Sequence, residues 1–240
     1  MQSSKLRIGI ISAEKSGDYL AASFIESLKS SGRDFELFGV GGKELDNFNI
    51  SRPQDFDREI LNVMGIIDPL KNLRQILRAR KQILDFLISK NINIFIGVDS
   101  PDLNSFFHKN LKKINSTINF QIVSPSVWAW RSGRVKQLRK FVDTTFCLFK
   151  FEHKYLKKHD VNSFHVGHPF QDIEKVEDVS SIKNRYGINN DSECLTFLVG
   201  SRRSEISSML PIYKKVIKRS MRVIKVIAFY SQWSIRIIKI

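Results

Sequence analysis

Cysteine is scarce in this sequence of 240 residues: only Cys147 and Cys194 occur, and their spacing fits no metal-binding motif. A disulfide scaffold is therefore excluded, and the two thiols are expected to stay separate in a reducing compartment. Long apolar runs are also missing. The longest, such as 226–230, fall far short of the roughly 20 residues that a spanning helix needs, and residues 1–9 lack the apolar region of a signal peptide. We expect a cytoplasmic protein.

Acidic side chains are few relative to basic ones, with 24 Asp or Glu against 39 Lys or Arg and a net charge of +15. The excess is uneven, because residues 206–240 contain eight basic and no acidic side chains, which leaves 31 against 24 in residues 1–205. Most of the chain is thus mildly basic and has no recognisable nucleic-acid motif, so nucleic acid is not an expected partner. The apolar content of 42% is that of a globular protein with one large or two small domains.

Strand and helix patterns alternate along the chain, which predicts a parallel sheet with helices on both faces. Apolar, β-branched segments predict strands at 7–11, 35–40, 92–98, 118–123, 145–148, 163–166 and 194–199. Helical spacing and capping residues predict helices at 18–30, 69–89, 101–114, from 134, at 152–159, and after a cap at Ser204.

Several loops that follow predicted strands have unusual sequences, and ligands of open α/β sheets bind at such loops. The loop 13–18 lacks the G-x-G-x-x-G fingerprint of a dinucleotide site, so a plain turn and a functional loop both fit its polar residues. Gly41 and Gly42 permit positive φ and a close backbone approach, and a tight turn explains the pair equally well. Trp128 and Trp130 fit either core packing or the wall of a ligand pocket.

Two aspartates lie near the end of the most apolar predicted strand. Asp99 follows that strand directly, at the carboxyl edge of the sheet, where a carboxylate can act as a general base. Asp102 comes one residue after a proline at a helix start, where a carboxylate stabilises the helix macrodipole. We therefore expect a chemical role for Asp99 and a structural role for Asp102.

A series of short motifs, in order between residues 6 and about 212, resembles the lipid-A-disaccharide synthase family. The motifs lie at 14–18, 38–42, 63–65, 97–104, 124–131, 151–152, 166–169 and 200–205. Each is weak evidence alone, but their joint occurrence is specific, and the segment with two tryptophans is the most diagnostic. Ala13, Lys150 and Val199 depart from the family, which usually has glycine, proline and proline there.

The resemblance implies an α/β fold of GT-B type, with two doubly wound Rossmann-like domains facing a cleft and the second domain incomplete in this chain. It implies a glycosyltransferase that joins a UDP-linked donor, UDP-2,3-diacylglucosamine, to the acceptor 2,3-diacylglucosamine 1-phosphate. The products are a β-1′,6-linked disaccharide and UDP, and the reaction uses no metal or other cofactor.

The resemblance also implies roles for individual residues. Asp99 matches the base that takes the proton of the acceptor 6-hydroxyl, and Arg202 matches a cation for the diphosphate. The other implied substrate-binding residues are Glu14, Ser16, Gly17, Asp18, Gly41, Gly42, Met64, Gly65, Ser126, Trp128, Trp130 and Glu205.

The predicted helix 69–89 is basic and amphipathic. Taken alone, this pattern favours a helix that packs on the core and exposes a solvated face. A lipid substrate makes docking on an anionic membrane the better interpretation, and both hold if one end packs inward and the other meets lipid. The residues expected to contact acyl chains or the membrane surface are Leu70, Leu73, Arg74, Ile76, Leu77, Arg78 and Lys81.

These observations suggest an acceptor and membrane-facing domain in residues 1–169, and a partial donor-nucleotide domain in 170–240 with a basic tail from about residue 213. Because the motifs and the charge balance are lost together, we expect a truncated or frameshifted product, with a divergent tail as the alternative. Two functions stay open. The chain is a working transferase, peripheral on the cytoplasmic face of the inner membrane, or an inactive fragment that retains the acceptor and membrane-binding domain.

Overall fold

The computed structural model describes residues 5–57, 60, 73–114, 116–130, 132–169, 178–191, 194–200, 203–220, 226–231 and 234–239. The chain divides into two compact units, Met1–Asp172 and Ile173–Ile240, which we call unit 1 and unit 2. Both combine strands with helices, as the alternating sequence pattern predicts. None of the helices in the described ranges is long and apolar enough to cross a membrane.

Unit 1 is built on a sheet of six parallel strands in the order β2-β1-β3-β4-β5-β6. The strands are β1 (Leu6–Ser12), β2 (Phe35–Val40), β3 (Ile94–Val98), β4 (Ile118–Ile122), β5 (Thr144–Cys147) and β6 (Ser163–His165). Strand β1 lies between β2 and β3, with Ile8 opposite both Leu37 and Ile94. The winding of the chain reverses between β1 and β3, which makes the carboxyl ends of these two strands the switch point of the fold.

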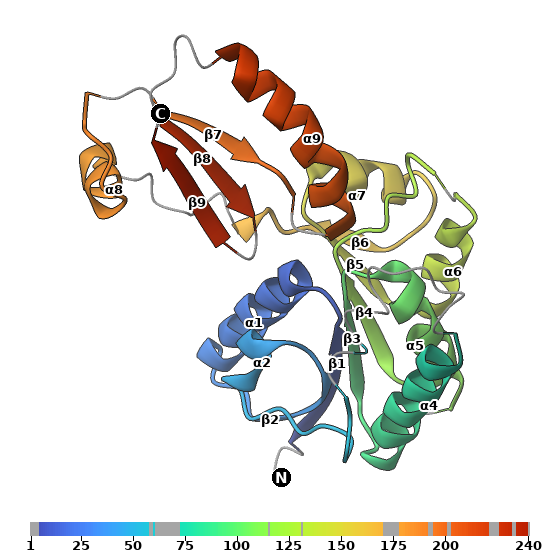
Figure 1. Ribbon diagram of the computed structural model, residues 1–240. Helices are drawn as coiled ribbons and strands as arrows, with labels where there is room; N and C mark the ends of the chain where they lie inside the picture. The colour runs from blue at the N-terminus through green and yellow to red at the C-terminus, as the bar shows by residue number, and fades with distance from the viewer. Residues whose placement is uncertain are drawn as a thin grey trace. The chain divides into compact units, whose positions relative to one another are not determined.

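Helices cover both faces of this sheet, with α1 and α2 on one face and α4 and α5 on the other (Figure 1). Their bounds are α1 (Lys15–Ser30), α2 (Lys43–Asp46), α4 (Leu73–Ser89) and α5 (Pro101–Ile114). A strand covered on both faces needs apolar residues at nearly every position. Residues 8–12 and 95–98 meet this requirement and are buried throughout.

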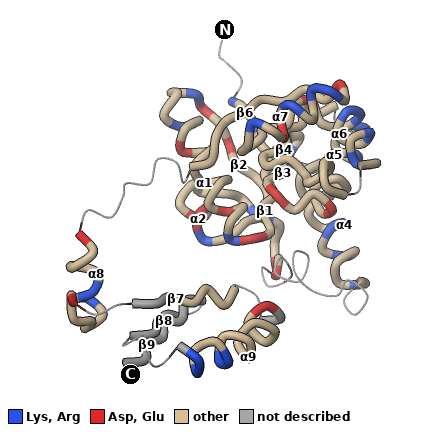
Figure 2. The backbone as a smooth tube through the Cα atoms, turned by 90° about the horizontal axis from the view of Figure 1, so that it is seen from above, with Lys and Arg blue, Asp and Glu red and all other residues tan. Residues whose placement is uncertain are grey.

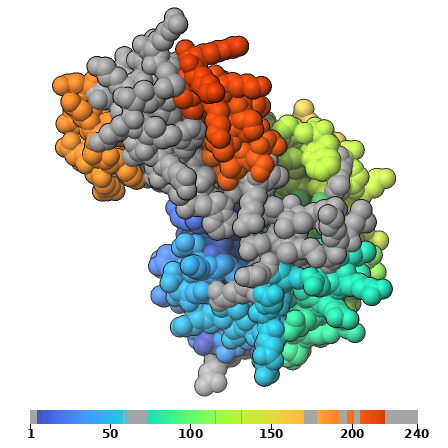
Figure 3. All heavy atoms as spheres, in the orientation of Figure 1, coloured from blue at the N-terminus to red at the C-terminus, as the bar shows by residue number. Residues whose placement is uncertain are grey.

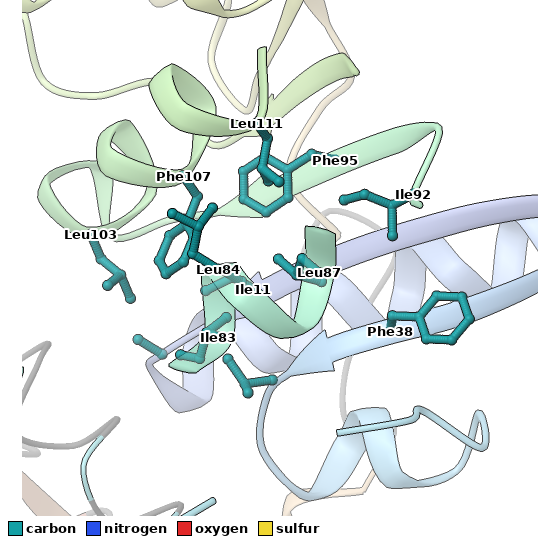
Figure 4. Close-up of a cluster of buried hydrophobic side chains, with 12 residues drawn as sticks. Ile11, Phe38, Ile83, Leu84, Leu87, Ile92, Phe95, Leu103, Phe107 and Leu111 are labelled. Atoms are coloured by element: carbon teal, nitrogen blue, oxygen red, sulfur yellow. The ribbon is translucent and has the colours of Figure 1, made fainter. Parts of the chain in front are cut away.

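Each face of the sheet has its own core. In the cluster of Figure 4, Leu87 of α4 and Phe107 and Leu111 of α5 pack with Phe95 of β3, and all four are fully buried. On the opposite face Ile25 of α1 belongs to a second buried cluster with residues of β1, β2 and β3. These clusters fix the strands and thereby the loops at the carboxyl edge.

A third buried cluster joins α6 (Arg134–Phe141) and α7 (Lys150–Lys157) to strand β5. It includes Cys147, whose thiol is buried and has a pKa raised to about 12 by burial and by the nearby Glu152. Such a thiol stays protonated and unreactive at neutral pH.

Unit 2 contains a three-stranded sheet in the order β7-β8-β9. Its elements are α8 (Val179–Arg185), β7 (Cys194–Leu198), α9 (Arg203–Ser220), β8 (Val226–Ser231) and β9 (Ser234–Lys239). Strands β7 and β8 are parallel and joined through α9, whereas β8 and β9 form an antiparallel hairpin. Four basic residues of the segment from about 213 lie on α9 (Figure 2), namely Lys214, Lys215, Lys218 and Arg219, and residues 221–225 lie outside the described residues.

The predicted elements agree with the structure to within one to three residues, with two informative differences. Helix α1 begins at Lys15 rather than Asp18, because Glu14 is extended and its carbonyl accepts from the Asp18 N–H at 2.8 Å. Helix α9 begins at Arg203, so Ser204 lies inside its first turn and is not the cap. Residues 69–72 of the predicted helix 69–89 lie outside the described residues.

Candidate functional site

Asp99 directly follows β3, next to the switch point. Its backbone is left-handed, with φ of 50°, and that of Ser100 is also left-handed, with φ of 38°. The Asp99 N–H donates to the carbonyl of Ile122 at 2.9 Å, which extends the pairing of β3 and β4 by one residue. The Asp99 side chain is half-buried. A carboxylate at this edge is placed to accept a proton from a bound hydroxyl.

The first turn of α1 lies beside Asp99. A Cβ built on Gly17 would lie 3.4 Å from the Asp99 Cβ and 3.6 Å from the carbonyl oxygen of Val98. Ser16 is exposed and Glu14 is half-buried in the same segment. The structure thus brings the β1–α1 segment and Asp99 together at one point of the sheet edge.

Asp18, expected to contact substrate, is buried, with 2% of its surface exposed. Its carboxylate instead accepts hydrogen bonds from the backbone N–H groups of Gly42, at 2.7 Å, and Glu44, at 2.8 Å. Burial raises the pKa of this carboxyl, and the two backbone hydrogen bonds oppose that rise. Because both oxygens have partners inside the protein, the carboxylate joins α1 to the start of α2.

The same carboxylate explains the pair Gly41 and Gly42. A Cβ on Gly42 would lie 2.6 Å from Asp18 Oδ2, and one on Gly41 would lie 2.4 Å from the Leu45 Cδ1. Gly42 has φ of −84°, and neither glycine has a positive φ. Positive φ is therefore absent at both glycines, and the close approach is made by the Asp18 side chain.

Trp128 and Trp130 are exposed, at 47% and 56%, which excludes core packing for both. The ring of Trp128 contacts that of Phe151 edge to face, at 5.1 Å between centroids. The guanidinium of Arg134 lies 5.6 Å from the centre of the Trp130 ring. Both tryptophans follow β4 at the carboxyl edge, as does the exposed Ser126.

Asp102 lies in the first turn of α5, as expected. It forms an ion pair with Arg134 at the start of α6. The guanidinium of Arg134 therefore connects the α5 start to the tryptophan segment.

In unit 2 the loop after β7 contains Gly200, which has φ of 100°. A Cβ there would lie 2.7 Å from both Cβ and Oε2 of Glu205, in the first turn of α9, so a larger residue would collide with this side chain. Arg202 lies outside the described residues, and so do Met64, Gly65 and Leu70.

Helix α4 has a buried face and an exposed face. Ile76, expected at the membrane, is 6% exposed and packs in the core, which corrects that assignment. Leu73 and Leu77 are 48% and 53% exposed. Three basic side chains of the same helix are also exposed, and Figure 3 shows α4, in teal, at the surface of unit 1. These basic residues are Arg74, Arg78 and Lys81.

Sequence reasoning missed three buried polar residues near Asp99: Asn104, His108 and Gln121. The side-chain amides of Asn104 and Gln121 donate to the Asp99 carbonyl at 2.8 and 3.1 Å, and His108 Nε2 lies 3.0 Å from Gln121 Oε1. The sequence pattern could have revealed them, because they are polar residues at buried positions. Gln121 interrupts an apolar strand, and Asn104 and His108 lie four residues apart on the apolar face of α5.

The model of the family described as lipid-A-disaccharide synthetase matches residues 8–234. The match continues beyond about residue 213, where the recognisable motifs end. A lipid-A-disaccharide synthase from Acinetobacter baylyi is 36% identical over 212 residues, which cover 87% of this chain and 52% of the relative. Lipid-A-disaccharide synthase 2 from Legionella pneumophila is 36% identical over 217 residues, which cover 90% of this chain and 55% of the relative. The chain spans about half the length of the curated relatives it matches.

Solved structures with little sequence similarity share the fold. A glycosyltransferase from Rickettsia africae superposes with a TM-score of 0.54 at 13% identity and covers 95% of this chain and 69% of its own. UDP-N-acetylglucosamine 2-epimerase from Rickettsia bellii gives a TM-score of 0.53 at 15% identity, and the match covers 95% of this chain and 62% of the epimerase. The fold is α/β of GT-B type, and this chain covers part of it.

Proposed function

Because the chain belongs to the lipid-A-disaccharide synthetase family, we propose that it transfers a diacylglucosamine unit from UDP-2,3-diacylglucosamine to 2,3-diacylglucosamine 1-phosphate. The products are the β-1′,6-linked disaccharide 1-phosphate and UDP. The observation that carries the proposal is the place of Asp99, a half-buried carboxylate at the switch point beside the first turn of α1. Ligands of doubly wound sheets bind at this edge.

In the proposed reaction Asp99 takes the proton of the acceptor 6-hydroxyl while the oxygen attacks the anomeric carbon of the donor. The new carbon–oxygen bond forms on the face opposite the leaving group, so the configuration inverts. The bond from the anomeric carbon to the diphosphate oxygen breaks, and UDP leaves with its electron pair. Cationic or N–H groups stabilise this developing charge, and Arg202 is the residue proposed for that role.

The proposed acceptor contacts lie in unit 1, in the segments that the structure places at the carboxyl edge. They are Glu14, Ser16, Gly17, Ser126, Trp128 and Trp130. Asp18, Gly41 and Gly42 support this edge through the contact between α1 and α2. Met64 and Gly65 stay proposed substrate contacts by resemblance, and we propose residues 170–240, with Glu205, for the donor side.

The acyl chains hold the proposed substrates in a membrane, so the protein must bind at the membrane surface to reach them. The exposed face of α4 supports peripheral binding at an anionic surface. Its exposed leucines, Leu73 and Leu77, lie among exposed basic side chains. Apolar contact together with positive charge is the combination that holds an interfacial helix on anionic lipid. We place the protein on the cytoplasmic face of the inner membrane.

The test is a transfer assay of the purified chain that measures both UDP and the disaccharide. Asp99→Asn should reduce the rate by about 10²- to 10⁴-fold, the usual contribution of a general base. Asp102→Asn is the matched control, since Asp102 is a nearby carboxylate in the first turn of α5 that is paired with Arg134. This control should cost stability and keep most of the rate.

A folded Asp99→Asn protein that retains more than about a tenth of the rate would remove Asp99 from the reaction. A wild-type chain that binds the acceptor and releases no UDP would favour the alternative function, an acceptor and membrane-binding unit without transfer.

A further inference from the structure

Three carbonyl groups at the carboxyl edge of the unit 1 sheet converge on one buried side chain. The Nε2 of Gln121 donates to the carbonyl oxygens of Ile122 at 3.0 Å, Asp99 at 3.1 Å and Val123 at 3.2 Å. Gln121 is 1% exposed and lies on β4, so its side chain links the end of β4 to the end of β3.

The backbone at these contacts is strained. Asp99, Ser100 and Val123 are left-handed, with φ of 50°, 38° and 71°. Left-handed backbone is a marked outlier for the β-branched Val123, and such residues persist only where the surrounding structure imposes them, most often at functional sites. Two of these residues, Asp99 and Val123, are contacts of the Gln121 amide, and Ser100 is the neighbour of Asp99.

A second amide contacts the same segment from α5. The Nδ2 of Asn104 donates to the carbonyl oxygen of Asp99 at 2.8 Å and to that of Val98 at 3.2 Å. Asn104 is fully buried. The Asp99 carbonyl thus accepts from two buried side-chain amides, one on α5 and one on β4. The Asp99 N–H donates to the carbonyl of Ile122.

The orientation of Gln121 is itself determined by His108. Because the NH₂ of Gln121 faces three carbonyl oxygens, its Oε1 faces His108 Nε2 and must accept, so His108 carries its proton on Nε2. His108 is 2% exposed, and burial lowers its pKa to about 4, which keeps the ring neutral at pH 7.

We propose that Gln121, oriented by His108 and assisted by Asn104, is a positioning residue that imposes the left-handed backbone at Asp99 and thereby places the Asp99 carboxylate at the sheet edge. The role of that carboxylate in transfer rests on the proposed function, whereas the effect on the backbone does not. A misplacement of a reacting group by about 1 Å can cost about 10²-fold in rate.

The experiment compares the isotope-labelled full chain with Gln121→Met, which keeps the volume of the side chain and removes its donors. Backbone chemical shifts report the conformation of Asp99, Ser100 and Val123 without any need for turnover. The matched control is Asn119→Leu. Asn119 is a fully buried amide of the same strand, and it donates to the carbonyls of His108 and Phe141 rather than to the carboxyl edge.

We expect both variants to lower the melting temperature, but only Gln121→Met to shift or broaden the signals of Asp99, Ser100 and Val123. Where the chain is active, Gln121→Met should lower kcat by about 10²-fold with little change in KM. If Gln121→Met does not fold, Gln121→Glu replaces it, because glutamate keeps the shape and leaves at most one donor hydrogen.

A folded Gln121 variant whose Asp99 and Ser100 signals match those of the wild type would overturn the proposal. So would equal changes at Asp99 in Asn119→Leu, because they would show a general loss of packing. If Asp99→Asn proves active while Gln121→Met still displaces Asp99, the proposed function fails and the positioning role stands.

Discussion

The carboxylate of Asp18 accepts the backbone N–H of Gly42 at 2.7 Å, across 24 residues of sequence. This hydrogen bond joins the first turn of α1, which lies beside Asp99, to the start of α2. A residue that sequence similarity places among substrate contacts thus stabilises the edge on which the proposed contacts lie.

The first prediction concerns this pair. Asp18→Asn presents one NH₂ group where the carboxylate presented an oxygen, so one backbone N–H loses its acceptor, at a cost of about 1 to 3 kcal/mol in the free energy of unfolding. Gly42→Ala should cost a similar amount, because its Cβ would lie 2.6 Å from Asp18 Oδ2. Urea unfolding measures both. Gly133→Ala is the control for adding a Cβ, because nothing lies within 4 Å there and φ is −57°. Unchanged stability in Asp18→Asn would contradict the structural role.

The second prediction is a pH dependence due to His108. Its pKa is about 4 in the folded protein, because burial disfavours the charged ring, against 6.5 when unfolded. The unfolded state therefore binds more protons between these values, and stability rises with pH across that interval. The contribution is complete above pH 6.5 and amounts to about 3 kcal/mol.

The measurement is the free energy of unfolding at several pH values between 4.5 and 7. His108→Gln should flatten the dependence, whereas His159→Gln, at an exposed histidine, should not. Equal slopes for His108→Gln and the wild type would show that His108 titrates normally.

The third prediction tests membrane docking by α4. Replacing Arg74, Arg78 and Lys81 with glutamate should release the chain from anionic vesicles, since each basic residue near such a surface contributes about 1 kcal/mol. The control reverses three exposed lysines of α7 and its C-cap, namely Lys154, Lys157 and Lys158. Cosedimentation at low salt measures binding. Equal loss in both triple variants would mean that net charge, not α4, governs binding.

The fourth prediction compares a binding role for Trp128 with a packing role for its neighbour Val127. Trp128→Ala should cost no more than about 1 kcal/mol of stability, because its main contact is one edge-to-face ring pair, and should weaken acceptor binding by about tenfold. Val127→Ala should do the reverse and cost about 1 to 3 kcal/mol of stability, because Val127 is 2% exposed. A Trp128→Ala protein that binds the acceptor normally would exclude this ring from the site.

The sheet was predictable because strands covered on both faces must be apolar at nearly every position, and 8–11 and 95–98 show this in the sequence. The roles of single side chains were harder to predict. Ile76 and Leu77 are adjacent in one amphipathic pattern, and only the neighbours of α4 determine that the first is buried and the second exposed. The partners of Asp18 come from residues 42 and 44, a long-range contact that no local pattern indicates. Asn104 and Gln121 contact backbone carbonyls, which every sequence contains, and His108 acts through Gln121.

The most direct test of an acceptor site at the carboxyl edge of the unit 1 sheet is a titration of the isotope-labelled chain with 2,3-diacylglucosamine 1-phosphate in detergent micelles. An acceptor site beside Asp99 predicts saturable shifts of the amide signals of Gly17, Asp99 and Ser126, with none at Gly32, which lies at the other end of α1. Detergent alone and glucosamine 1-phosphate without acyl chains are the control titrations. Saturable shifts that leave Gly17, Asp99 and Ser126 unaffected, or no saturable shifts at all, would contradict an acceptor site at this edge of the sheet.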